Sequence, residues 1–167
     1  TSDYYKHHHY YQKLIKKNLN IRKYLENVNY VASKKIFTTG FAMMGFPSET
    51  EKDIKQTIDV ACTSKLHAIS FFTLTPFPNT VVYDIVLKSN PEKLKRINYD
   101  DSEYSHIKFN LADVPDEILF YYQRKANRDF YMNPSRVARI LRDFPQKSRL
   151  VTFIPEFFKR LSKGLFN

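Results

Sequence analysis

The residues best placed to do chemistry in this 167-residue chain lie around Gly45, where an apolar run ends in a Gly-Phe-Pro turn. Residues 35–44 are apolar and β-prone and predict a buried strand. Gly45 can adopt backbone angles forbidden to other residues and lets a ligand approach the main chain closely. Ser48 and Glu51 have the spacing of a capping box, which predicts a helix start. A strand–turn–helix corner at Gly45 is therefore the first candidate site.

A second candidate lies where the next apolar run ends. Residues 68–75 predict a strand that runs into a proline-rich turn beginning at Pro76. Strand, helix and strand with short joins predict a βαβ unit with parallel neighbouring strands. Ligands of parallel α/β sheets and barrels bind at the carboxyl ends of the strands. We therefore expect Gly45 and Pro76 to lie side by side.

Other segments predict the helices that hold these turns. Asn20 is a candidate N-cap for a helix over residues 21–33, and residues 81–88 predict a short helix after the Pro76 turn. Asp113 is the candidate N-cap of a helix through Tyr131. A basic helix over residues 136–143 follows, with an inward and an outward set of side chains. The inward set is Val137, Ile140 and Leu141, and the outward set is Arg136, Arg139 and Arg142.

No catalytic triad, paired-carboxylate site or metal-ligand cluster competes with these turns. His67 and His106 lack spaced partners, so each is interpreted as a surface or satisfied structural histidine. The run of residues 7–9, all histidine, is read as a solvated helix end or as a nickel- or zinc-binding segment. Tyr99, Tyr104 and Asp100 are candidates for lining a substrate mouth, but nothing selects them.

Two ordered runs carry a resemblance to a known family. The first is Gly-Phe-x-x-x-Gly-Phe-Pro-x-Glu-Thr-Glu-x-Asp-Ile-x-x-Thr-Ile over residues 40–58. The second is Phe-x-x-Leu-Thr-Pro-Phe-Pro-x-Thr-x-x-Tyr over residues 71–83. In this combination the chain resembles radical SAM enzymes over residues ~11–145. It is most similar to the branch that often carries an amino-terminal cobalamin (B12)-binding domain, and related runs occur in radical SAM tRNA methylthiotransferases.

The resemblance implies a fold and a binding site. The fold is α/β, the carboxyl-terminal part of a partial (β/α)6 TIM-like barrel with parallel strands over residues 1–90. A linker and a basic α-helical extension would fill residues 91–167. Met43 would contact the adenine of S-adenosylmethionine beside Gly45, with Phe41 deeper. Main-chain groups of Leu74 and Thr75 would bind the adenine edge, whereas the ribose-binding residue is not assigned.

The cysteine count limits what this chain does by itself. A radical SAM enzyme holds its [4Fe-4S] cluster with three cysteines, typically Cys-x-x-x-Cys-x-x-Cys. This chain has one, Cys62, on the apolar face of a predicted helix, where it is interpreted as a packed thiol. We therefore expect the carboxyl-terminal piece of a longer enzyme, inactive alone, with the cluster motif elsewhere. The alternative is a degenerate relative that works as a non-catalytic binding module.

The reaction stays open at this level. In the family the cofactor performs the hard step, because reductive cleavage of S-adenosylmethionine gives a 5′-deoxyadenosyl radical that the protein orients. A preceding cobalamin domain would allow methyl transfer or oxidation, so both transferase and oxidoreductase chemistry are compatible with the residues. Neither a catalytic residue nor the substrate can be read from the chain.

The net charge of +10 bears on partners and compartment. Basic residues concentrate in residues 13–23 and after Arg124. Three readings compete: a solvated helix face, an amphipathic helix on an anionic membrane surface, and RNA contact; no DNA partner is expected. No apolar run is long enough to span a bilayer, and no signal-peptide pattern is present. The expected compartment is the cytoplasm, with a peripheral membrane location under the second reading.

Overall fold

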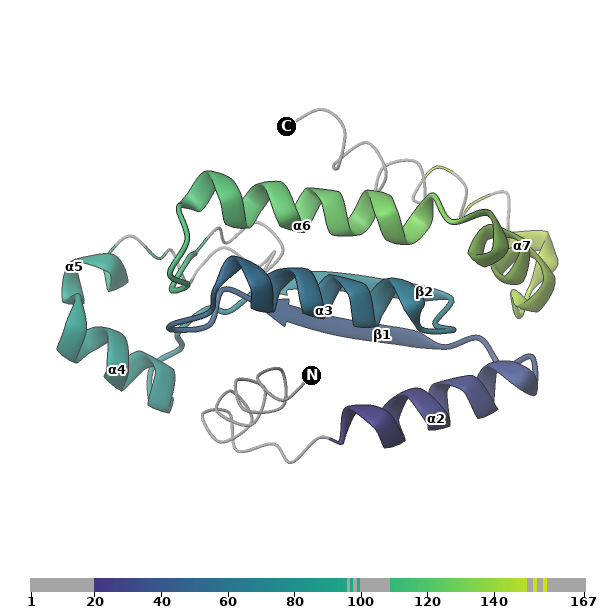
Figure 1. Cartoon of the computed structure of the whole chain (residues 1–167), viewed down its shortest axis with the longest axis horizontal. Helices are drawn as coiled ribbons and strands as arrows, with labels where there is room; N and C mark the ends of the chain where they lie inside the picture. Colours follow the sequence, from purple (N-terminus) through teal and green to yellow (C-terminus); the bar gives the residue numbers. More distant parts are fainter. Residues whose placement is uncertain are drawn as a thin grey trace.

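The structure, a computed structural model, describes residues 20–95, 97, 99, 109–149, 152 and 155. The described part of the chain is a mixed α/β structure with a two-stranded sheet (Figure 1). Its elements are α2 (Ile21–Ser33), β1 (Thr39–Met44), α3 (Glu51–Thr63), β2 (Ala68–Thr73), α4 (Val81–Ser89), α5 (Pro91–Leu94), α6 (Asp116–Tyr131), α7 (Pro134–Asp143) and the short 3-10 helix η1 (Lys147–Arg149).

The sheet is the parallel βαβ unit that the sequence predicts. β1 and β2 pair in parallel, with Thr39 opposite Ala68 at one end and Met44 opposite Thr73 at the other. α3 connects the two strands. In Figure 1 the arrowhead of β1 points toward the side where α4 and α5 lie, and α7 lies at the opposite side. The carboxyl ends of both strands therefore meet at one end of the sheet.

The main core lies on one face of the sheet. Met44, Ile69 and Phe71 point to this face, because side chains alternate between the two faces of a strand. They pack against buried residues of three helices, namely Val28 of α2, Ile54, Ile58 and Ala61 of α3, and Leu119, Ala126, Phe130 and Tyr131 of α6. α2, α3 and α6 thus share this face.

Side chains of α6 close the outer edge of β2. The Tyr131 hydroxyl accepts the N–H of Ile69 at 3.0 Å and donates to the carbonyl oxygen of the same residue at 2.8 Å. Gln123 donates from Nε2 to the carbonyl oxygen of Phe71 at 2.9 Å. A further strand would pair with these same backbone groups, so α6 makes β2 the last strand on this side.

The outer edge of β1 is different. The backbone carbonyl of Met44 points toward β2, since its oxygen accepts the N–H of Leu74 at 2.8 Å. Alternate residues of a parallel strand point to the other edge, so the backbone groups of Thr39, Phe41 and Met43 face away from β2. Among the described residues, no side chain hydrogen-bonds to these groups as Tyr131 does on the other edge.

Two helix starts show how local sequence sets the element boundaries. Asn20 is the N-cap of α2 as predicted, and its side chain accepts a backbone N–H of the first turn. The predicted capping box of Ser48 and Glu51 is wrong. The N-cap of α3 is Thr50, which forms a capping box with Asp53. Ser48 lies instead in the turn before the helix, with φ of 64°.

Both strands are shorter than predicted. β1 begins at Thr39 because the chain leaves α2 through Lys35 in a left-handed conformation, with φ of 58°, and extends only afterwards. β2 ends at Thr73, and Thr75 lies beyond it. The apolar residues outside each strand belong to the connecting turns.

The later helices differ from the prediction at some of their boundaries. Asp113 is not the N-cap of α6; Pro115 is, and the N–H of Asp113 donates to the carbonyl oxygen of Glu49 at 2.9 Å. α4 extends one residue beyond its predicted end, to Ser89. α7 begins at Pro134, with Asn133 as N-cap. None of the described helices is both long and apolar enough to cross a bilayer.

Candidate functional site

The carboxyl ends of the strands form the candidate site, and we call residues 44–49 and 73–76 the strand-end rim. The chain leaving β2 passes beside the turn after β1, because Leu74 hydrogen-bonds to Met44 at 2.8 Å. A Cβ on Gly45 would lie 3.7 Å from the Leu74 nitrogen. The structure therefore brings Gly45 and Leu74 together, as parallel strands require.

Two features of the fold require a glycine at position 45. Its φ is 84°, in the left-handed region that side-chain-bearing residues rarely adopt. A Cβ at this position would also approach Cδ2 of Leu119 in α6 to 3.2 Å. That contact lies on the helix-covered side of the sheet. A larger residue here would both strain the turn and push against the core.

Phe41 and Met43 lie on the opposite side of the sheet, which we call the open face and define by Phe41, Met43, Ser70 and Phe72. Phe41 is 74% exposed and Met43 is 43% exposed. The ring centroids of Phe41 and Phe72 are 5.9 Å apart across the two strands. The two apolar side chains expected to contact adenine therefore lie on the face that the described helices leave uncovered.

Leu74 and Thr75 lie where the chain leaves β2. The side chain of Leu74 is buried in a small second core with Phe46 and Val82, while Thr75 is half-buried. Burial of this side chain leaves only the main chain of Leu74 for contact with a ligand, which is the role that the resemblance implies for it. Of the five predicted site residues, Gly45, Leu74 and Thr75 line the rim, whereas Phe41 and Met43 lie on the open face.

Glu49 is a component of the rim whose importance the sequence alone does not reveal. Its side chain is almost completely buried, and Oε2 accepts the N–H groups of both Gly45 and Phe46. Burial raises the pKa of Glu49 to about 7, although the two backbone hydrogen bonds act in the opposite direction. The signal that the sequence does carry is a glutamate four residues after the turn glycine.

The β2 side of the rim is held by a tyrosine. The Tyr99 hydroxyl donates to the carbonyl oxygen of Pro76 at 2.7 Å, and its ring lies 5.8 Å from that of Phe77. Burial raises the pKa of the Tyr99 phenol. Tyr99 therefore fixes the Pro76 turn, which places it beside the rim. Asp100 and Tyr104 lie outside the described residues.

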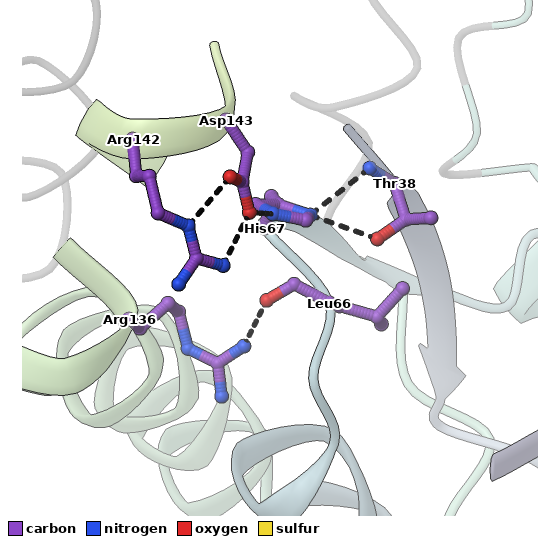
Figure 2. Close-up of polar contacts among 6 residues, drawn as sticks. All are labelled: Thr38, Leu66, His67, Arg136, Arg142 and Asp143. Atoms are coloured by element: carbon purple, nitrogen blue, oxygen red, sulfur yellow. Dashed lines mark hydrogen bonds and ion pairs between the residues drawn. The ribbon is translucent and has the colours of Figure 1, made fainter. Parts of the chain in front are cut away.

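A second polar cluster lies at the amino ends of the strands, where α7 docks (Figure 2). His67 is fully buried; its Nδ1 accepts the Thr38 N–H at 3.1 Å and lies 2.9 Å from Thr38 Oγ1. Because Nδ1 is an acceptor here, Nε2 carries the proton and donates to Asp143 Oδ2 at 3.1 Å. Arg142 donates to both oxygens of Asp143. His67 is thus a satisfied structural histidine rather than a surface one.

This cluster contains the residue types of a hydroxyl–histidine–carboxylate triad, but its geometry serves structure. Nδ1 of His67 already accepts the backbone N–H of Thr38, which occupies the position needed to take the hydroxyl proton. The imidazole is stacked on Phe37 with ring centroids 4.9 Å apart and has no exposed surface. A substrate therefore has no access to it.

Arg136 corrects a sequence prediction. It was expected to point outward but is 1% exposed, whereas Leu141, expected inward, is 50% exposed. The Arg136 guanidinium donates to three carbonyl oxygens at the end of α3 and the loop after it, those of Leu66, Cys62 at 2.7 Å and Ser64 at 3.2 Å. Carbonyl oxygens at the end of a helix lack partners within the helix and attract a cation. The α3–β2 corner therefore supplies hydrogen-bond acceptors for the buried guanidinium.

The ring of Phe130 covers the buried guanidinium of Arg136. The guanidinium carbon lies 3.5 Å from the ring centroid, which is a close cation–π contact. Burial lowers the pKa of Arg136 to about 10. Arg136 Nε has no hydrogen-bond partner among the described residues. The buried guanidinium of Arg136 therefore attaches α7 to the βαβ unit.

The described residues offer no ligand set for an iron–sulfur cluster. The chain has a single cysteine, Cys62, which is half-buried on α3, and burial raises the pKa of its thiol. No group of three histidine, cysteine or acidic side chains converges within the part of the chain that the structure describes. The histidine run at residues 7–9 and His106 lie outside it. With one cysteine in the whole sequence, the chain lacks the three thiolates that hold such a cluster.

The basic surfaces are described only in part. Residues 13–19 lie outside the described residues, as do most of those after Arg149. Within α7, Arg136 is buried and Arg142 is bound to Asp143, so these two charges are already used inside the molecule. Contact of the basic tail with RNA or with an anionic membrane surface stays a prediction.

Comparison of the chain with family models, with curated proteins and with solved structures found no match.

Proposed function

We propose that this chain forms the last two β/α units of the partial barrel of a radical SAM enzyme, with the adenosyl group bound at the strand-end rim and the open face. The observation that carries the proposal is the asymmetry of the sheet. Helices cover one face, while Phe41 and Met43 are exposed on the other. A pair of parallel strands with an uncovered apolar face resembles the end of a barrel whose other strands come from elsewhere.

The two edges of the sheet support the same assignment. Tyr131 and Gln123 occupy the edge of β2, where a following strand would pair. The edge of β1 presents the backbone of Phe41 and Met43. The barrel would therefore extend from β1 toward preceding strands, and β2 would be its final strand.

Each site residue has a role that its position allows. Met43 and Phe41 supply apolar surface for the adenine ring, and the main-chain carbonyl of Leu74 and the main chain of Thr75 supply hydrogen-bonding groups, because the Leu74 N–H already donates to Met44. Gly45 shapes the turn beside them. When bound, S-adenosylmethionine supplies the adenosyl group through reductive cleavage of a carbon–sulfur bond. The task of this chain is to orient that group and to exclude water from it.

The cluster, and any cobalamin, would be held by residues outside this chain. Cys62 is the single thiol, and it is packed against the core rather than directed at the rim. The chain alone is therefore inactive in this proposal. Its substrate is set by parts of the enzyme that these residues do not include.

The test begins with the native polypeptide that contains these residues. Peptide mapping by mass spectrometry should find a Cys-x-x-x-Cys-x-x-Cys segment in the same polypeptide or in a tightly bound one. After anaerobic reconstitution with iron and sulfide and reduction, the assembly should release 5′-deoxyadenosine from S-adenosylmethionine. This chain alone should give no cluster absorbance. An assembly that contains the segment but does not cleave S-adenosylmethionine overturns the proposal.

A pair of lysine substitutions tests the site itself. Met43→Lys introduces a charge on the open face and should abolish binding of S-adenosylmethionine to the assembly. Leu141→Lys makes the same change at a position on α7 of similar exposure, 50% against 43%, and should leave binding unchanged. Equal behaviour of the two variants contradicts the assignment of the open face.

A further inference from the structure

Glu49 joins three segments that meet at the strand-end rim. Its Oε2 accepts the N–H of Gly45 and, at 3.1 Å, that of Phe46. The N–H of Glu49 donates to the carbonyl oxygen of Phe46 at 3.0 Å, and its own carbonyl oxygen accepts the N–H of Asp113 at 2.9 Å. This residue therefore connects the end of β1, the start of α3 and the segment that leads into α6.

The chemistry of this contact is unusual for a turn. Consecutive N–H groups converge on one oxygen, as in an anion-binding nest, but the anion is a side chain of the protein itself. Glu49 is 2% exposed, so its charge is largely removed from water. A neutral glutamine would offer the same acceptor atom without the desolvation cost. The ionisable group is thus not needed for the shape of the turn alone.

We propose that Glu49 is the positioning residue of the strand-end rim. Its carboxyl group fixes the backbone of Gly45 and Phe46 in the conformation that receives the ligand, and the protonation state of this group sets the stability of the closed turn. The identity of the ligand as an adenosyl group rests on the function proposed above. The hold on the turn is a property of this chain alone and is tested separately.

The direction of the pH effect follows from linkage. Burial raises the pKa of Glu49 from 4.5 to about 7 in the closed turn. When the turn opens, the carboxyl group reaches water and regains its ordinary pKa. The closed form therefore binds the proton more tightly, and opening becomes easier as the pH rises from about 5 to 8. A difference of this size changes the opening equilibrium by roughly a hundredfold.

The neighbours of Glu49 define the control. Among the described residues, Asp53 of α3 is the charged side chain that acts on Glu49, and its negative charge raises the pKa further. The segment before α6 meets Glu49 through the backbone N–H of Asp113. β2 presents the uncharged Leu74 beside the turn. Asp53, which caps the same helix, is therefore the acidic group whose contribution must be separated from that of Glu49.

Amide hydrogen exchange of the full 167-residue chain, measured by NMR between pH 5 and 8, tests the proposal. Rates are divided by the intrinsic rate at each pH to give protection factors. Protection of the Gly45 and Phe46 amides should fall roughly a hundredfold over this range. The Ala68 amide, which donates to Thr38 at the other end of the sheet, is the reference and should change only as far as it exchanges through global unfolding, which also exposes Glu49. Constant protection of Gly45 and Phe46 overturns the proposal.

Two matched variants assign the effect. Glu49→Gln should keep both amides protected at every pH, whereas Asp53→Asn should retain most of the pH response. The same pH response in Glu49→Gln as in the wild type rejects Glu49 as its source. If Glu49→Gln does not fold, the pH response of the Gly45 and Phe46 amides in the wild type and in Asp53→Asn still decides.

Binding measurements on the complete assembly separate this inference from the proposed function. The affinity for S-adenosylmethionine should fall with rising pH in the wild type relative to Glu49→Gln. A pH-dependent turn in an assembly that does not bind S-adenosylmethionine supports the hold on the turn and rejects the proposed function. If the assembly binds S-adenosylmethionine but the protection of the turn does not change with pH, the role of Glu49 is rejected and the proposed function is retained.

Discussion

The Tyr131 hydroxyl forms two hydrogen bonds with the backbone of Ile69, at 3.0 and 2.8 Å, and so replaces a neighbouring strand at that position. An edge strand normally offers these groups to any other extended chain. The ring of the same tyrosine packs in the core against Phe130, with centroids 5.0 Å apart. One side chain therefore both fills the core and ends the sheet.

Tyr131→Phe should separate these two roles, because it keeps the ring and removes the hydroxyl. The unsatisfied backbone of Ile69 should lower the free energy of unfolding by about 1–3 kcal/mol, measured by urea denaturation. The freed edge should also promote self-association, measured by light scattering. Tyr121→Phe, at a position 47% exposed, is the control and should change neither quantity. Self-association equal to that of the control contradicts the edge-closing role.

Arg136→Met should lower the free energy of unfolding by about 2–4 kcal/mol, because three carbonyl oxygens lose a buried donor. Arg136→Lys should recover little of this loss, since an ammonium group cannot reproduce the planar fork of the guanidinium. Chemical denaturation measures both. Arg22→Met removes a side chain that is 84% exposed and should have little effect. A small loss in Arg136→Met would show that α7 docks without this contact.

Asp143→Asn should lower the free energy of unfolding at pH 7 by about 1–3 kcal/mol, because it weakens the bonds to Arg142 and His67. These hydrogen bonds, that of Arg142 foremost, hold the pKa of Asp143 well below its usual range. The stabilisation is therefore present above the ordinary carboxyl pKa and is lost as the pH falls through the lowered value. Urea denaturation at pH 7 and near pH 2 should find a large difference between wild type and variant only at pH 7.

Glu49→Gln should show the opposite pH dependence in global stability. The folded-state pKa of Glu49 is raised, so its contribution is fully present below 4.5 and is lost as the pH rises through about 7. At pH 8 the variant should be more stable than the wild type by roughly 2–4 kcal/mol, whereas near pH 4 the two should be similar. Denaturation curves at both values measure this. A variant less stable at pH 8 would mean that the charge stabilises the fold.

Phe41→Ser and Phe71→Ser compare the two faces of one sheet. Phe41 is 74% exposed, so its replacement should change the free energy of unfolding by less than about 0.5 kcal/mol. Phe71 is 6% exposed in the main core, and its replacement should cost about 3–5 kcal/mol. Denaturation of the chain provides the comparison. A large loss in Phe41→Ser would show that the open face is covered in solution.

Local signals were enough to predict the central βαβ unit. Two β-prone runs flank a segment with helical spacing, and short joins leave parallel pairing as the simple arrangement. Asn20 marks the start of α2 because its side chain reaches a backbone N–H within one turn. The meeting of Gly45 and Leu74 follows from parallel pairing alone, so the position of the rim was predictable.

Contacts between distant segments were not predictable in this way. Arg136 lies on the polar side of its helix by composition, yet carbonyl oxygens 70 positions earlier draw it inside. His67 has no partner within its own segment and pairs with Asp143, 76 positions later. Glu49 gives no local signal of its contact, because its side chain turns back onto Gly45 instead of capping α3. In each case the partner is defined by packing and leaves no periodic pattern in the chain.

The attachment of α7 to the α3–β2 corner has a consequence for synthesis on the ribosome. The carbonyl groups at the end of α3 emerge first and must wait for Arg136, which is translated 70 residues after Leu66. At ordinary elongation rates this interval lasts roughly 3–14 seconds, much longer than a helix takes to form. During that time water must hydrogen-bond the carbonyl groups at this corner, so the corner becomes buried only when α7 docks.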